Sequence, residues 1–76
     1  MRETKDDLTA RELDVLRLVA AGGSDKLIGT RLGIARSTVS NHVSVVLLKL
    51  GAANRAEAVA IGIRDGLIET TRGEDR

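Results

Sequence analysis

With 76 residues, the chain has room for a single small domain with a modest core. It contains no Cys, Phe, Tyr or Trp, which excludes disulfides, thiolate metal sites and base stacking on aromatic rings. The net charge of +1 is too small to indicate nucleic-acid binding by itself.

The ends of the chain are polar, and the apolar residues lie between them. We expect a disordered N-terminal tail over residues 1–7, one domain over residues 8–68 and a polar C-terminal tail over residues 69–76. No signal-peptide pattern follows the N-terminus, and no apolar stretch reaches the ~20 residues of a membrane span. A cytoplasmic location without membrane contact is therefore expected.

The first predicted helix covers residues 10–21. Thr9 is its expected N-cap because Glu12 follows three residues later, the spacing of a capping box, and Gly22 marks its end. Its apolar stripe consists of Leu13, Leu16, Val19 and Ala20.

Glu12 lies inside this apolar pattern, where a carboxylate is costly unless it is paired. Catalysis is a poor explanation because no second acid, histidine or nucleophile is arranged with it. We therefore predict a structural ion pair between Glu12 and Arg55, which lies beside the start of the last helix.

The next elements have the spacing of a helix-turn-helix. Ser24 is expected to cap a short helix over residues 25–32, and Gly33 ends it. Gly29 inside this helix costs ~1 kcal/mol relative to Ala, which close approach of another helix would explain. The connection over residues 33–35 is too short for an antiparallel return, so a longer helix should cross the short one.

That longer helix, residues 36–50, has two contrasting sides. One side is an apolar stripe for the core, made of Val39, Val43, Val46, Leu47 and Leu50. The other is small and uncharged, made of Ser37, Ser40, Asn41, Ser44 and Leu48. A solvated face would be richer in Lys and Glu, whereas this one suits a hydrogen-bonding surface such as a DNA groove.

Two sets of residues are therefore candidates for DNA contact. For base edges they are Ser37, Ser40, Asn41 and Ser44, since Asn can pair with adenine and Ser can donate or accept. For the DNA backbone they are Ser24, Lys26, Arg36, Thr38 and His42. The alternatives are a solvated helix face, scattered surface charge and, for His42, a half-buried structural role.

Charge is unevenly distributed along the chain. Between Ser24 and Lys49, four cations stand against one acid, whereas acids and bases balance in the segments on either side. The positive excess therefore coincides with the unusual helix.

The last predicted helix begins after Asn54 and ends before Gly66. Its buried side is expected to carry Val59, Gly62, Ile63 and Gly66, with Leu67 and Ile68 packing back onto the domain. Ile61 falls almost opposite and is expected to be exposed.

Many of these residues match one family in register. They are Leu8-Thr9, Arg11-Glu12, Val15-Leu16, Leu18-Val19-Ala20, Gly22, Ser24, Lys26, Ile28, Leu32, Ile34, Thr38-Val39, His42-Val43, Lys49-Leu50-Gly51, Arg55 and Ala58-Val59. The chain resembles the LuxR-type (GerE-like) helix-turn-helix domain over nearly all of residues 8–68. The resemblance implies an all-α fold of four short helices and a bacterial transcription regulator that binds double-stranded DNA.

The resemblance also implies partners and roles. The third helix would enter the major groove, and the last would make a weak homodimer, with Glu57, Ala60, Ile61 and Arg64 as the expected contacts. RNA polymerase is a further candidate partner, while no cofactor, metal or small-molecule ligand is expected. Because the family usually has a receiver or ligand-binding domain as well, the chain resembles an excised C-terminal domain or a stand-alone regulator.

Three positions depart from the family pattern. Ala35 replaces the usual Ser or Thr cap, which costs about 1 kcal/mol, and Leu27 replaces a common Glu. Ser40 stands where a DNA-contacting Lys is usual, which reduces the expected affinity. The alternative function is a small helical protein-interaction module without DNA binding, with Leu27, Val45 and Leu48 as its exposed contacts.

Overall fold

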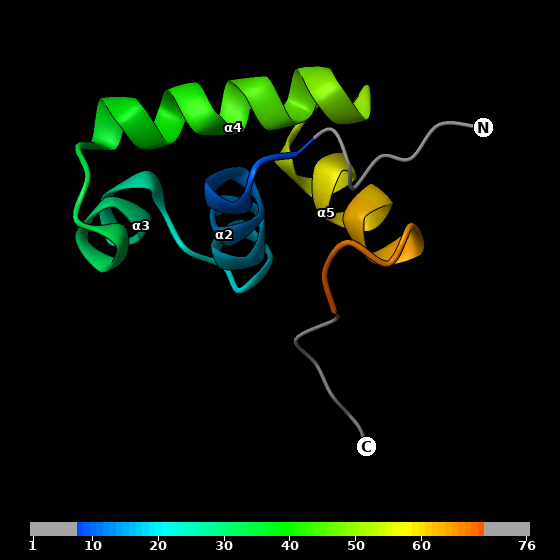
Figure 1. Cartoon of the computed structure of the whole chain (residues 1–76), viewed down its shortest axis with the longest axis horizontal. Coiled ribbons are helices and arrows are strands. Elements are labelled where there is room, and N and C mark those ends of the chain that lie inside the picture. The colour runs from blue at the N-terminus through cyan, green and yellow to red at the C-terminus, as the bar shows by residue number, and fades with distance from the viewer. Residues whose placement is uncertain (1–7, 70–76) are drawn as a thin grey trace.

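A computed structural model describes residues 8–69 of the chain. Four helices make up this part: α2 (Ala10–Ala20), α3 (Asp25–Leu32), α4 (Arg36–Leu50) and α5 (Arg55–Arg64). Residues 8–69 contain no strand, which confirms the expected all-α fold. The predicted N-terminal tail (residues 1–7) and, apart from Glu69, the predicted C-terminal tail (residues 69–76) lie outside the described part. In Figure 1, α4 forms one long edge of the molecule, with α3, α2 and α5 along its inner side.

The helices begin and end where the local signals predict. Thr9 Oγ1 accepts a hydrogen bond from Glu12 N at 3.1 Å, and Glu12 Oε1 accepts one from Thr9 N at 2.9 Å, which completes the predicted capping box. Ser24 caps α3 by accepting from Leu27 N and Asn54 caps α5 by accepting from Glu57 N, whereas Ala35 offers no side-chain cap to α4. These bonds satisfy N–H groups that would otherwise lack partners.

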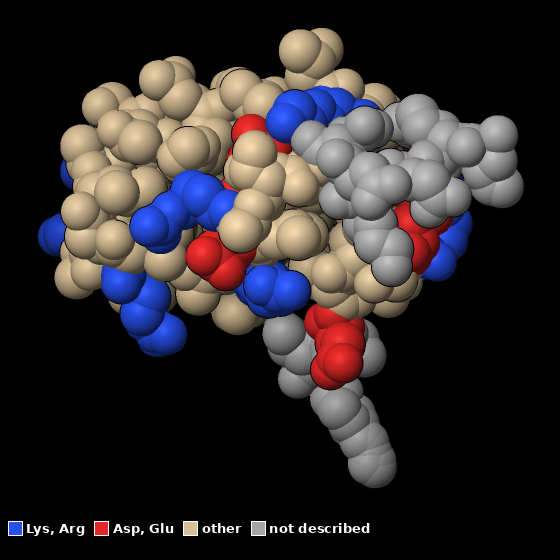
Figure 2. Space-filling model, viewed as in Figure 1, with Lys and Arg blue, Asp and Glu red and all other residues tan. Residues whose placement is uncertain are grey.

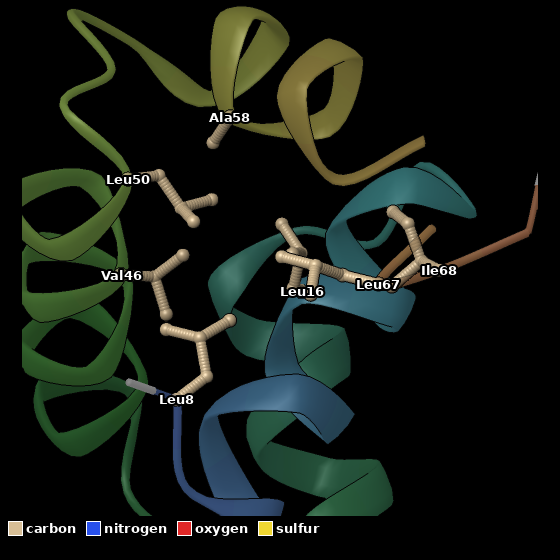
Figure 3. Close-up of a cluster of buried hydrophobic side chains, with 7 residues drawn as sticks. All are labelled: Leu8, Leu16, Val46, Leu50, Ala58, Leu67 and Ile68. Atoms are coloured by element: carbon tan, nitrogen blue, oxygen red, sulfur yellow. The ribbon is translucent and has the colours of Figure 1, made fainter. Parts of the chain in front are cut away.

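The core consists of two apolar clusters that share α2. The first contains Leu8, Leu16, Val46, Leu50, Ala58, Leu67 and Ile68. Figure 3 shows these side chains converging from the segment before α2, from α2, α4 and α5, and from the segment after α5. The second contains Val15, Ile28, Val39 and Val43. Because Val15 and Leu16 are neighbours on α2 but belong to different clusters, α2 is buried over a wider arc than the predicted stripe.

Gly29 is buried, and α4 approaches it as expected, because Arg36 N and Val39 Cγ2 of α4 would each lie 3.6 Å from a Cβ atom there; the turn before α4 comes closer still. A Cβ atom at Gly29 would lie 2.7 Å from the carbonyl oxygen of Ile34, in the turn between α3 and α4. Ile34 N also donates to the Gly29 carbonyl at 2.9 Å. The turn backbone therefore folds directly onto α3, and glycine permits this close approach.

Gly29→Ala is expected to lower the free energy of unfolding by about 1–2 kcal/mol, because the clash with turn backbone outweighs the gain in helix propensity. Urea denaturation of both proteins measures this difference. Thr30→Ala, at the exposed neighbouring position, is the control and should change stability by less than about 0.5 kcal/mol. A Gly29→Ala variant as stable as the wild type would show that the turn can move freely.

Candidate nucleic-acid interface

Helix α4 is anchored along one side and exposed along the other. Its buried residues are Val39, Val43, Val46 and Leu50. The opposite side carries the reading stripe, defined here as Ser37, Ser40, Asn41, Ser44, Val45 and Leu48, all of which are exposed. The structure thus confirms the predicted two-sided helix, while the contribution of each stripe residue to DNA binding stays a prediction.

The polar groups of the reading stripe are available to a ligand. Within residues 8–69, the side chains of Ser37, Ser40, Asn41 and Ser44 make no hydrogen bond. In Figure 2 the upper edge, along α4, is mainly tan, with blue side-chain atoms toward the C-terminal part of the helix. Free hydroxyl and amide groups on a helix that fits a groove can hydrogen-bond to base edges.

The candidate backbone contacts surround this stripe but differ in exposure. Ser24, Lys26 and Arg36 are exposed, and the Ser24 hydroxyl oxygen already accepts a hydrogen bond from Leu27 N at 3.1 Å. Thr38 and His42 are half-buried. The structure therefore brings Lys26, near the start of α3, and Arg36, at the start of α4, to the surface.

The positive charge of the central segment is concentrated on three side chains. Asp25 is bound by Arg55, and Lys49 by Glu12. Lys26, Arg31 and Arg36 have no ion-pair partner in the described part of the chain. Free cations at α3 and at the start of α4 can contact phosphate groups beside a groove.

The predicted ion pair between Glu12 and Arg55 is wrong. Glu12 Oε1 instead accepts from Lys49 Nζ at 2.8 Å, which ties the start of α2 to the end of α4. Arg55 Nη2 donates to Asp25 Oδ1 at 2.6 Å, which ties the starts of α5 and α3 together. Glu12 is buried as expected. Lys49 reaches it because the C-terminal end of α4 lies next to the start of α2.

Neither Lys49 as the partner of Glu12 nor Asp25 as the partner of Arg55 was predicted from the sequence. Only the position of Lys49 could have been inferred from the sequence. Lys49 lies seven residues after His42, so both fall on one line along α4. That line runs beside the reading stripe and faces Glu12, whose pKa is lowered by electrostatic interaction with Lys49 and His42. The pairing of Asp25 with Arg55 has no comparable signal, because it depends on how two short helices pack.

Burial raises the pKa of the Glu12 carboxyl, but several contacts together outweigh it. They are the hydrogen bond from Lys49, the hydrogen bond from Thr9 N, and the charges of Lys49 and His42. The net result is a lowered pKa, so Glu12 is ionised in the folded domain at neutral pH. His42 is therefore half-buried beside this ion pair, which supports the structural role for it.

The exposed isoleucine of α5 is not the predicted one. Ile61 is half-buried and packs against the first apolar cluster, whereas Ile63 is 41 % exposed. Glu57, Ala60 and Arg64 are exposed as expected. The reason is that α5 is covered from two directions, by α2 and by Leu67 and Ile68, which shifts its buried arc.

A metal cluster and a membrane-spanning helix are both absent from residues 8–69. Among residues 8–69, no three His, Asp or Glu side chains gather where they could hold a metal ion. The same residues include no helix with the length and apolar character to cross a membrane.

Comparison with known proteins points to one family. The family described as "Bacterial regulatory proteins, luxR family" matches residues 6–61. The chain is 42 % identical over 62 residues to the transcriptional regulatory protein DegU of Brevibacillus brevis, covering 82 % of the chain and 26 % of that protein. It is 40 % identical over 68 residues to the uncharacterized transcriptional regulatory protein YvfU of Bacillus subtilis, covering 90 % and 34 %.

A third relative has a similar relation to the chain. The probable transcriptional regulatory protein NarL of Mycobacterium tuberculosis is 44 % identical over 62 residues, covering 82 % of the chain and 29 % of that protein. The chain spans at most 34 % of the length of these three relatives.

Proposed function

Because the chain belongs to the luxR family of bacterial regulatory proteins, a family of DNA-binding transcription regulators and not of enzymes, we propose that α4 is its DNA-recognition helix. In this proposal α4 enters the major groove of double-stranded DNA, and the reading stripe meets the base edges. The observation that carries it is the stripe itself, which is exposed and opposite the buried side of α4, and whose side chains make no hydrogen bond within residues 8–69.

The dimensions of α4 support this placement. Its 15 residues give a length of about 22 Å, and a helix of about 10–12 Å diameter fits the major groove of about 12 Å width. Lys26 on α3 and Arg36 at the start of α4 would then lie near the phosphates. The reading stripe carries no cation, so affinity would come from these flanking side chains.

Helix α5 is the proposed contact between two copies on DNA. Ala56, Ala60 and Ile63 are exposed at a spacing that places them on one side of α5. Glu57 and Arg64 flank them; Glu57 accepts from Ala53 N at 2.6 Å, and Arg64 Nε donates to Asp65 at 3.0 Å. A two-fold contact through so small a surface would be weak and would form mainly on DNA.

Asn41→Ala and Lys26→Ala are expected to weaken DNA binding in different ways. Asn41→Ala should reduce specific binding by about 1–3 kcal/mol and leave binding to random DNA nearly unchanged, because Asn41 would contact a base. Lys26→Ala should weaken both kinds of binding and reduce the salt dependence, because a phosphate contact carries no sequence information. Titration of both variants on specific and random duplexes at several salt concentrations tests this. If Asn41→Ala loses the same affinity for the specific and the random duplex, Asn41 contacts the DNA backbone and not a base.

Selection of bound sequences from random duplex DNA tests the function itself. An inverted repeat of two short half-sites, bound with strong salt dependence, is the expected result. The competing function is a protein-interaction module, which the exposed side chains of Leu27, Val45 and Leu48 favour. That module would give no enrichment of any duplex, and the proposal would then be abandoned.

A further inference from the structure

We infer that the reading stripe selects half-sites rich in A·T base pairs, with Leu48 and Val45 contacting thymine C5-methyl groups. The inference rests on the proposed placement of α4 in the major groove and adds the class of base pair that this surface recognises. Two observations support it: the types of side chain in the reading stripe, and the exposure of Val45 and Leu48 near its end.

The reading stripe lacks the side chains that recognise G·C pairs most strongly. Guanine is read by the paired donors of Arg or Lys, and the cytosine amino group by Asp or Glu. Its members are Ser, Asn, Val and Leu alone. Arg36 borders the reading stripe, about 40° around the helix from Ser40 and about 140° from Asn41, and the proposed placement assigns it to a phosphate; Lys49 is held by Glu12.

The side chains that are present match A·T pairs. The amide of Asn41 can donate to N7 and accept from the amino group of adenine, as Asn commonly does in the major groove. Thymine is the base with a methyl group there, and apolar side chains recognise it by contact. Leu48 is 82 % exposed, more than any other large apolar side chain described, and Val45 is 36 % exposed.

Leu48 and Asn41 are aligned so that both can face one groove. Seven residues separate them, which is two helical turns to within about 20°. The same separation is about 10.5 Å along α4, or about three base-pair steps of about 3.4 Å. Asn41 and Leu48 would therefore contact different base pairs of one half-site, with Val45 between them.

Contact with a methyl group gives this exposed leucine a measurable effect. Burial of one methyl-sized apolar group contributes ~0.8 kcal/mol, which corresponds to about a fourfold change in affinity. A duplex with deoxyuridine in place of thymidine removes that methyl group and keeps the base-pairing edge. The substitution therefore isolates the contact that Leu48 and Val45 would make.

The experiment begins with half-sites selected from random duplex DNA and replaces each thymidine by deoxyuridine in turn. For the wild type, at least one replacement in the half-site should weaken binding about fourfold, and replacements outside the half-site should have no effect. Leu48→Ala should bind the thymidine duplex more weakly and lose its response at one of these positions. Leu27→Ala, which shortens a leucine 53 % exposed on α3, is the matched control and should respond as the wild type does.

The remaining outcomes separate a failure of this inference from a failure of the proposed function. Salt-dependent binding to G·C-rich half-sites, equal affinity for thymidine and deoxyuridine duplexes, or an unchanged response in Leu48→Ala would overturn the inference alone. If no duplex is bound, the proposed function fails and the inference fails with it. Thermal melting of the two alanine variants verifies that both fold, as expected for substitutions of exposed side chains.

Discussion

Lys49→Met is expected to destabilise the domain by about 2 kcal/mol at neutral pH, because it leaves the Glu12 carboxylate buried without its cation. Removing one partner of a fully buried pair costs ~3–5 kcal/mol. The loss here should be smaller, because the Lys49 side chain is 31 % exposed whereas that of Glu12 is 9 % exposed. Urea denaturation at pH 7 measures the difference.

The pH dependence of stability should distinguish this mechanism from a loss of packing. In the wild type, the pKa of Glu12 is lower in the folded state than in the unfolded state. The stabilisation of the fold by ionised Glu12 is therefore present above the unfolded pKa of about 4.3 and is lost as the pH falls through the folded pKa. In Lys49→Met, burial raises the pKa and the strongest opposing contact is gone. The loss in free energy of unfolding caused by Lys49→Met should therefore be largest near pH 7 and shrink as the Glu12 carboxyl becomes protonated toward about pH 4.

Two further variants serve as controls. Glu12→Gln combined with Lys49→Met removes the buried charge and keeps a capping residue, so it should recover part of the stability at pH 7. Arg55→Met breaks the more exposed pair with Asp25 and should cost less than about 1 kcal/mol. If Lys49→Met lowers the free energy of unfolding equally at about pH 4 and pH 7, the loss does not come from the buried Glu12 carboxylate.

Ile63→Glu is expected to abolish cooperative binding to a two-half-site operator and leave binding to a single half-site unchanged. The substitution would place two carboxylates near each other across the proposed two-fold contact, beside exposed Ala60. Loss of a coupling free energy of about 1–3 kcal/mol would lower operator affinity about 5- to 150-fold. Titration of duplexes with one and with two half-sites measures both quantities.

Ile61 supplies the contrast on the same helix. It packs against the first apolar cluster, so Ile61→Glu should destabilise the fold, whereas Ile63→Glu should melt close to the wild type. Both variants are compared by thermal unfolding before any DNA titration. If Ile63→Glu still fills both half-sites cooperatively, α5 does not make the dimer contact.

The sequence by itself determined the helices and the exposed side of α4. Thr9, Ser24 and Asn54 cap helices because each side chain binds an N–H three residues later, and Gly33 and Gly51 adopt the left-handed conformation that ends them. These interactions are local, so residue type and spacing decide them. The two-sided pattern of α4 is equally local, since a period of 3.6 residues assigns each residue to a side.

Only the tertiary structure decided which distant residues meet. Glu12 and Lys49 are 37 positions apart, and their contact depends on where α4 crosses α2. Helix periodicity predicts that α5 has a buried side, but the packing of Leu67 and Ile68 turns that side toward Ile61 and exposes Ile63. The closest approach to Gly29 likewise comes from the Ile34 carbonyl in the turn, with α4 just beyond it. Partner choice in such contacts follows from crossing angles and chain returns, which no local pattern in the sequence encodes.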